Sequence, residues 1–80
     1  MQIKIHTFGI ARDICGGPVI SLALPDYATA RQLKQHLMER YPRLGDLSSF
    51  LLAVNEEYAE PDTPIQPQDE IALIPPVSGG

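Results

Sequence analysis

Cysteine is almost absent from this sequence: Cys15 is the single one among 80 residues. One cysteine cannot close an internal disulfide, which excludes a secreted fold held together by disulfide bonds and makes the cytoplasm the expected location. The two histidines, His6 and His36, are distant in sequence from Cys15 and from each other, so the paired spacing of a metal site is missing. We therefore expect two solvated histidines, no metal site and no permanently bound cofactor.

Basic clusters and long apolar runs are also missing. The formal net charge is −4, and lysine and arginine form no cluster, which argues against nucleic-acid binding because phosphate repels an acidic surface. An acidic balance instead favours docking onto basic protein surfaces. No apolar run approaches the roughly 18 residues of a membrane-spanning helix, and no charged-then-apolar leader opens the chain. We expect a soluble, unexported protein that does not bind membranes.

Side chains suited to covalent catalysis are few. The serines lack the glycine-flanked pattern of a nucleophile elbow. Cys15 is a candidate persulfide carrier, since Gly16 and Gly17 would expose it. A neighbouring Arg12 would lower its pKa, but no CxxC partner or nearby histidine is present, so a partly buried structural cysteine is favoured. A single domain of this size buries roughly 60% of its unfolded surface and has no room for a deep cleft, which favours a carrier, a binding module or a subunit.

Alternating apolar and polar residues predict two strands at the start of the chain. Residues 2–8 place Ile3 and Ile5 on one face, and residues 19–24 resume the alternation after a break. The expected inward residues of the second strand are Ile20, Leu22 and Leu24. Residues 9–17 are interpreted as a loop, so the two strands are predicted to form an antiparallel hairpin.

A helix is predicted to begin at Thr29, because Thr29 and Gln32 have the spacing of a capping box. Pro42 is expected to end it. Its apolar stripe, expected to pack on the sheet, consists of Ala30, Leu33, Leu37 and Tyr41.

The second half of the chain predicts a loop, two further strands and an irregular connection. The loop is expected at residues 43–49, and the strands at 50–54 and 71–74, with a short extra strand around 57–59. The order β-β-α-β-β predicts an α+β fold, in which a mixed sheet packs on one main helix.

The last residues have no strand or helix signal. We expect a domain over residues 1–74 and a tail over 75–80, which begins with the rigid pair Pro75-Pro76 and ends with Gly79-Gly80. Average glycine usage of about 7% gives two closing glycines by chance in about one chain in two hundred. A carboxylate carried on Gly80 has no side chain beside it and fits a narrow tunnel, and glycine accepts backbone angles that other residues cannot.

These residues resemble the small subunits of molybdopterin synthase, a family of ubiquitin-like sulfur carriers with the β-grasp fold. The resemblance covers essentially all 80 residues. Its most specific parts are Phe8-Gly9-Ile10-Ala11-Arg12-Asp13, Ala53-Val54-Asn55, Asp69-Glu70-Ile71 and Pro75-Pro76-Val77-Ser78-Gly79-Gly80. The family more often has alanine in place of Gly9 and glutamate in place of Asp13, and we expect these differences to leave the tail untouched.

The resemblance implies a chemistry centred on Gly80. A terminal carboxylate has a pKa of about 3.3–3.7 and is a poor electrophile at neutral pH. An activating enzyme of the ubiquitin-activating type would use ATP and Mg²⁺ to adenylate Gly80, and a sulfur donor protein would displace AMP to leave a thiocarboxylate. The tail would then enter the large synthase subunit and give its sulfur to a cyclic pyranopterin monophosphate. Gly80 would be the reacting residue and Gly79 would give access, while all catalytic side chains would belong to the partner.

An interface with the large subunit is expected beside the tail. If Ile71 and Leu73 point inward, the period of a strand turns their neighbours outward. The expected interface residues are Phe8, Ala72, Ile74, Pro75, Pro76 and Val77. The alternatives are a sulfur carrier for thiazole synthesis or tRNA thiolation, which usually lacks the Pro-Pro-Val-Ser spacer, and a ubiquitin-like interaction module or protein tag.

Overall fold

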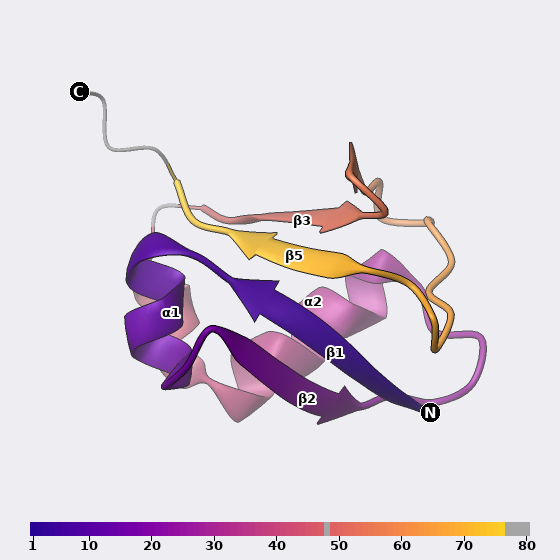
Figure 1. The fold of residues 1–80 in the computed structure, drawn as a ribbon, viewed down its shortest axis with the longest axis horizontal. Coiled ribbons are helices and arrows are strands. Elements are labelled where there is room, and N and C mark those ends of the chain that lie inside the picture. Colours follow the sequence, from indigo (N-terminus) through magenta and orange to yellow (C-terminus); the bar gives the residue numbers. More distant parts are fainter. Residues whose placement is uncertain (48, 77–80) are drawn as a thin grey trace.

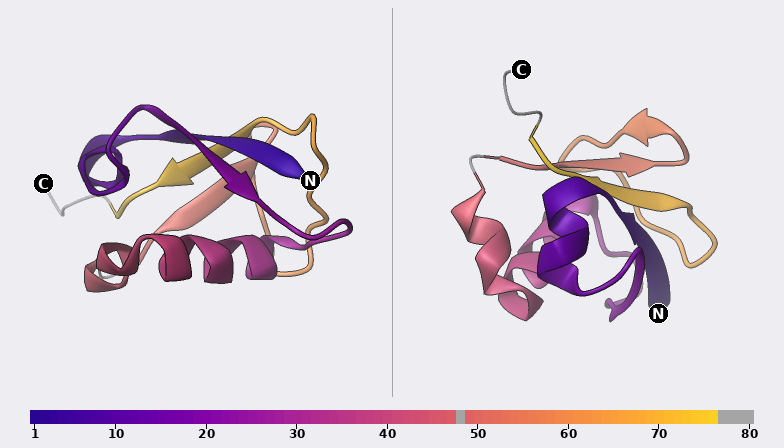
Figure 2. Two further views of the ribbon diagram at one scale, coloured as in Figure 1. Left: turned by 90° about the horizontal axis from the view of Figure 1, so that it is seen from below. Right: turned by 60° about the vertical axis from the view of Figure 1, so that its left-hand side comes forward.

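The computed structural model describes residues 1–47 and 49–76. It shows a five-stranded sheet with helices packed on one face (Figures 1 and 2). The elements follow one another as β1 (Gln2–Thr7), α1 (Gly9–Cys15), β2 (Val19–Ala23), α2 (Ala30–Arg40), the 3-10 helix η1 (Pro42–Asp46), β3 (Leu51–Val54), β4 (Glu57–Tyr58) and β5 (Ile71–Ile74).

The sheet is mixed, with strand order β2-β1-β5-β3-β4. β1 is antiparallel to β2 and parallel to β5, and β3 is antiparallel to both β5 and β4. The predicted hairpin, the α+β class and the short extra strand are therefore confirmed. The first and last strands of the chain lie side by side at the centre of the sheet (Figure 1).

The core lies between the sheet and α2, as Figure 2 shows. The predicted inward faces of all three alternating strands are confirmed, since Ile3, Ile5, Ile71 and Leu73 are almost completely buried. The second strand and α2 contribute a further buried set, namely Ile20, Leu22, Leu24, Ala30, Leu33 and Leu37. The apolar stripe of the helix therefore packs on the sheet as its spacing predicts.

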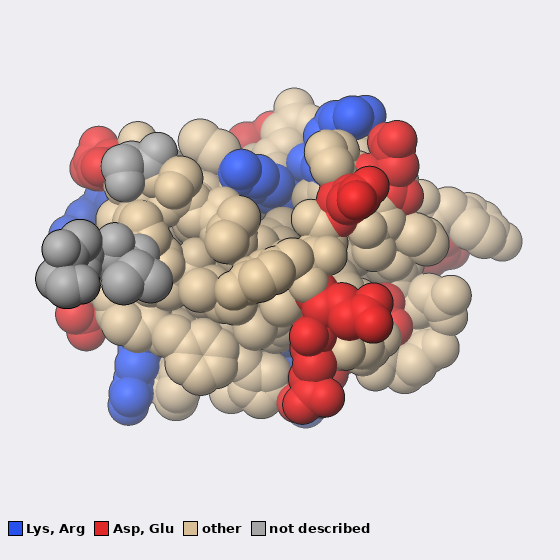
Figure 3. Space-filling model, turned by 90° about the horizontal axis from the view of Figure 1, so that it is seen from above, with Lys and Arg blue, Asp and Glu red and all other residues tan. Residues whose placement is uncertain are grey.

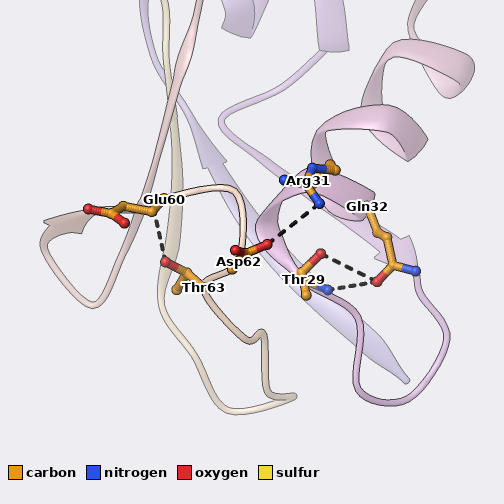
Figure 4. Close-up of polar contacts among 6 residues, drawn as sticks. All are labelled: Thr29, Arg31, Gln32, Glu60, Asp62 and Thr63. Carbon is orange, nitrogen blue, oxygen red and sulfur yellow. Dashed lines mark hydrogen bonds and ion pairs between the residues drawn. The ribbon is translucent and has the colours of Figure 1, made fainter.

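The predicted capping box at the start of α2 is confirmed. The backbone N–H of Thr29 donates to Oε1 of Gln32 at 2.9 Å, and the reciprocal bond from the third residue of the helix is also present. The turn before β5 is fastened to the same helix end, because the Ala30 N–H donates to the Thr63 carbonyl at 2.8 Å. Figure 4 shows this end of α2 with the Thr29–Gln32 contact. It also shows the exposed ion pair between Arg31 and Asp62, in which nitrogen and oxygen are 3.5 Å apart.

Two predicted loops are wrong, because residues 9–15 form α1 and residues 42–46 form η1. α1 is only 7 residues long, and Ala11 is its one buried residue, so no apolar period appears in the sequence. Gly16 ends it with φ +85° and donates its N–H to the Arg12 carbonyl. Thr7 holds the far side of this connection by donating its N–H to the Pro18 carbonyl at 2.9 Å and its hydroxyl to Gly17.

Residues 1–47 and 49–76 include no helix that is both long and apolar enough to span a membrane.

Candidate functional site

The topology brings three chain segments together where β5 ends. β1 and β5 are parallel, so both end at the same edge, and Thr7 pairs with Leu73. The next residues along each strand, Phe8 and Ile74, are therefore neighbours. β3 is antiparallel to β5 and begins at this edge, where Leu51 pairs with Ile74. Figure 1 shows α1 and the start of β3 on either side of the end of β5.

An apolar surface lies on the face of the sheet that is turned away from α2. Ile71 and Leu73 are fully buried, whereas Ala72 and Ile74 between and after them are partly exposed. Phe8 and Leu51 are each 52% exposed. We call Phe8, Leu51, Ala72 and Ile74 the outer patch. The predicted orientation of Ala72 and Ile74, with Phe8 beside them, is confirmed as geometry.

Leu51 is a member of the outer patch that the sequence did not reveal. Residues 50–54 are uniformly apolar, which hides the alternation. The signal appears only once Phe50 and Leu52 are known to be buried, because Leu51 between them must then point outward.

The same face of the sheet extends beyond the outer patch. Cross-strand pairs form one row, which runs through Val19, His6, Ala72, Ala53 and Tyr58. Val19 is 46% and Tyr58 69% exposed, so both ends of the row are open to solvent. Most of the large exposed apolar side chains, namely Phe8, Val19, Leu51 and Tyr58, therefore share one face.

The tail root follows directly after the outer patch. Pro75 and Pro76 are partly buried, and Gly9 lies so close that a Cβ built on it would be 3.2 Å from Cγ of Pro75. Gly9, one of the two positions at which the sequence differs from the family's more usual residue, therefore adjoins the first residue of the tail. The other predicted tail residues, Val77, Gly79 and Gly80, lie outside the described residues.

The surroundings of Cys15 are those of a cysteine that contributes to packing. It is partly buried against the core, and this burial raises the pKa of its thiol. The expectation that Arg12 lowers that pKa is wrong, because desolvation dominates. His6 and His36 are partly buried rather than fully solvated. Within the described part of the chain, no group of three or more His, Cys, Asp or Glu side chains is arranged to hold a metal ion.

Charge is unevenly spread over the surface. Figure 3 views the molecule from above Figure 1, and most of the acidic side chains on this side gather toward the end with the β3–β4 turn, beside a broad area with few charges. Two exposed acidic residues, Glu56 and Glu57, belong to the β3–β4 turn and its following strand. The outer patch carries no charged side chain.

Comparison with known proteins places the chain in a family. The ThiS family model matches residues 5–80. The molybdopterin synthase sulfur carrier subunit of Dictyostelium discoideum is 42% identical over 83 residues, covering 99% of this chain and 96% of the relative. The corresponding subunit of Arabidopsis thaliana is 37% identical over 81 residues, covering 100% of this chain and 84% of the relative.

Solved structures agree on the fold. Subunit 1 of a putative molybdopterin converting factor from Pyrococcus furiosus superposes with a TM-score of 0.86 at 22% identity, over 96% of this chain and 99% of the other. A chain of the complex of subunits 1 and 2 of molybdopterin-converting factor from Helicobacter pylori has a TM-score of 0.66 at 26% identity, with both chains fully covered. The fold is the ubiquitin-like β-grasp, and the chain belongs to the ThiS family and, within it, to the molybdopterin synthase sulfur carrier subunits.

Proposed function

We propose that this chain carries sulfur for molybdenum cofactor synthesis as a thiocarboxylate on Gly80. The carrying observation is that relatives named molybdopterin synthase sulfur carrier subunit match the chain over essentially its whole length. The outer patch supports the same proposal, because it puts an apolar docking surface directly beside the tail root.

The energetics of the tail explain why a docking surface is needed. Ordering six tail residues costs on the order of 6–12 kcal/mol, at about 1–2 kcal/mol for each residue, and somewhat less because Pro75 and Pro76 are already restricted. The tail alone is therefore a weak ligand. Burying Phe8, Leu51 and Ile74 against the large subunit would supply the remaining free energy.

The chemical steps follow from the poor reactivity of a carboxylate. An activating enzyme would join the Gly80 carboxylate to AMP from ATP and Mg²⁺, releasing pyrophosphate and leaving a mixed anhydride with a good leaving group. A sulfur donor that delivers sulfur at the sulfide level would attack the Gly80 carbonyl carbon through that sulfur and expel AMP, and loss of a proton would leave the thiocarboxylate. Once the sulfur is bonded to the cyclic pyranopterin monophosphate, water would cleave the bond between that sulfur and the Gly80 carbonyl carbon, and the oxygen of the water would regenerate the Gly80 carboxylate for another cycle.

The chain acts here as a subunit of the synthase rather than as its catalyst. Its partners would be the large subunit, the adenylating enzyme and the sulfur donor. The complex of subunits 1 and 2 from Helicobacter pylori supports an assembly of this kind, because one of its chains shares the fold at 26% identity. Gly80 would react, Gly79 would give access to a narrow passage, and Pro75, Pro76 and Val77 would lead the tail into it.

A second candidate is a carrier that delivers sulfur to a different acceptor. The ThiS family match favours sulfur carriage as a class. Restored growth of cells that lack the small synthase subunit, without restored growth of cells that lack a thiamine sulfur carrier, would assign the acceptor to molybdopterin. The reverse result would assign it to thiazole synthesis.

Intact mass tests the proposal directly. The purified chain is incubated with ATP, Mg²⁺, the adenylating enzyme and the sulfur donor, and we expect the mass to rise by the difference between one sulfur and one oxygen atom. Fragmentation should place this change on Gly80. A conjugate to lysines of other proteins, with no thiocarboxylate, would contradict the proposal and indicate a protein tag.

A further inference from the structure

We propose that the groove between α2 and the edge of β3 binds an extended segment of a partner protein, in which an apolar and an acidic residue stand two positions apart. The groove has a volume of about 550 Å³ and is lined by side chains of α2. The outer patch lies on the opposite face of the sheet, and Leu51 at the edge borders both surfaces. Binding in this groove would not require the sulfur chemistry of Gly80.

The edge of β3 is open where the strand begins. β4 pairs only with the last two residues of β3, and the ladder ends where the Ala59 N–H donates to the Leu52 carbonyl at 2.8 Å. The chain then turns to α2, where the Pro61 carbonyl accepts from the Arg31 N–H at 3.0 Å. Backbone groups alternate along a strand, so Phe50 should turn its N–H and carbonyl to the same edge as Leu52. Such an edge accepts an extended peptide through main-chain hydrogen bonds.

Side chains of α2 form the wall of the groove that faces this edge. Arg31, Lys34 and Met38 line it, and their spacing of three and four residues puts them on one side of the helix. Met38 is exposed, and the apolar lining continues along β3 with Phe50 and Leu51. The wall is therefore cationic in the first half of α2 and apolar in the second half.

The cations of this wall are available to a partner. The Lys34 ammonium lies 4.9 Å from the centre of the Phe50 ring, and among residues 1–47 and 49–76 no carboxylate is close enough to pair with it. Arg31 and Asp62 form an ion pair, but both side chains are largely exposed, so the pair holds Arg31 only weakly. Glu60 also lines the groove, and Figure 4 shows its carboxylate pointing away from Arg31. In a chain of net charge −4, this groove therefore favours an acidic ligand.

The dimensions of a helix and a strand set the spacing of the ligand. The step from Lys34 to Met38 spans about 6 Å along the helix axis. Two residues of an extended strand span about 6.6 Å, and their side chains point to the same side. A strand added to the edge of β3 can therefore place a carboxylate near Lys34 and a bulky apolar side chain near Met38, with one outward-facing residue between them.

The experiment is a titration of the full chain with short capped peptides at low ionic strength, followed by amide chemical shifts. The probe peptide has leucine and aspartate two positions apart among serine and threonine residues. One control peptide has lysine in place of the aspartate, and another has leucine and aspartate adjacent. Ordering a flexible peptide offsets much of its contact energy, so we expect a Kd on the order of 1 mM for the probe and weaker binding of both controls. The shifts should centre on Lys34, Phe50 and Leu51.

Two variants separate the groove from a general effect of charge. Lys34→Glu should weaken binding of the probe by at least about fivefold, and it should bind the lysine peptide more tightly than the unchanged chain does. Arg40→Glu is the matched control, because it makes the same change of charge on the same helix at a residue that does not line the groove. Its Kd for the probe should stay within about twofold of the unchanged chain. Tm measurements show that both variants are folded.

The inference fails if the probe causes no shift of the groove amides at several millimolar, or if all three peptides bind equally. Equal losses from Lys34→Glu and Arg40→Glu would also overturn it, because the charge of Lys34 would then have no special place. Shifts confined to the outer patch would put the peptide on the other face and overturn it too. Each of these results leaves the Gly80 thiocarboxylate to be tested separately by intact mass.

Discussion

The two ends of the sheet are finished in opposite ways. At the end with the β3–β4 turn, polar groups bond to one another and acidic side chains face the solvent. At the other end, the outer patch leaves Phe8 and Leu51 half exposed beside the tail root. One end is therefore completed within the chain, whereas the other has the composition of a surface that a partner covers.

We call the end of the sheet with the β3–β4 turn the distal end, and hydrogen bonds of Asn55 hold it together. Asn55 accepts a bond from the Glu70 N–H at 3.0 Å and donates to the Asp69 carboxylate at 3.1 Å. Its own N–H donates to the Glu70 carbonyl at 2.8 Å. The β3–β4 turn is thereby tied to the residues that lead into β5. Folding and docking should consequently depend on different ends of the molecule.

The largest expected effect on docking comes from a charge in the outer patch. Ile74→Asp would bury an unpaired carboxylate against the large subunit, which should cost roughly 2–4 kcal/mol, or about 30- to 1,000-fold in Kd. The fold should lose only about 1 kcal/mol, because Ile74 is partly exposed. Titration calorimetry and thermal melting measure the two effects.

Tyr58→Asp is the matched control for Ile74→Asp. It places the same charge on an exposed apolar residue of the same face, at the distal end. Its Kd should stay within about twofold of the unchanged chain. Equal weakening by both variants would move the interface to the whole sheet face, and unchanged affinity of Ile74→Asp would place it elsewhere.

Asn55→Ala should have the opposite effect: it should weaken the fold and leave binding to the large subunit unchanged. It removes both side-chain bonds of Asn55 and places alanine at φ +53°, so we expect a loss of about 2–3 kcal/mol in the free energy of unfolding. Affinity for the large subunit should be unchanged at temperatures where the protein is folded. Urea titration gives the stability. A weakened Kd in the folded protein would show that the two ends are coupled.

A smaller effect, this time a gain in stability, is expected from a change at Glu56, the residue after Asn55. Asn55 and Glu56 occupy the centre of the β3–β4 turn with φ +53° and +71°, the backbone of a turn that prefers Asn-Gly. Glu56→Gly relieves strain of about 1–2 kcal/mol and adds about 0.5–1 kcal/mol of backbone entropy to the unfolded state. A net stabilisation of about 0.5–1 kcal/mol should appear in the urea midpoint; a lower midpoint would contradict this assignment of strain.

The smallest effect concerns Cys15. Its raised pKa means less thiolate in the folded chain than in the unfolded one at neutral pH, so iodoacetamide should react more slowly before urea is added than after. The raised pKa also makes stability depend on pH. The neutral, buried thiol stabilises the fold at neutral pH, and this stabilisation is lost as pH rises through the ordinary cysteine pKa and then the raised one. Faster alkylation of the folded chain would revive the persulfide interpretation.

The sequence predicted the elements whose periodicity is long enough to see. The alternation around Ile3 and Ile5 and the stripe through Leu33 and Leu37 were correct because these faces are buried. α1 was missed because a helix of 7 residues with Ala11 as its one buried residue shows no period. η1 was missed because Pro42 ends α2 and also starts the next turn, which a stop signal alone does not reveal.

The candidate site was predicted in part, for similar reasons. Period two oriented Ala72 and Ile74 correctly, but it failed for Leu51, whose neighbours are all apolar. Gly9 gave no signal because its contact with Pro75 joins residues that are distant in sequence and meet only through the parallel pairing of β1 with β5.

The most direct test of the central claim is to extend the chain after Gly80. One added residue turns the Gly80 carboxylate into an amide and moves the terminal carboxylate up to about 3.6 Å further along, which is as large as the separation that reacting atoms need. An extension before Met1 lies at the opposite end of the sheet (Figure 1), where the backbone N–H at Met1 can still donate to the Leu24 carbonyl. Molybdenum cofactor synthesis is measured in cells that lack the small subunit and receive the unchanged, N-extended or C-extended chain. The account predicts activity from the first two and none from the third; full activity from a C-extended chain whose intact mass shows the added residue would contradict it.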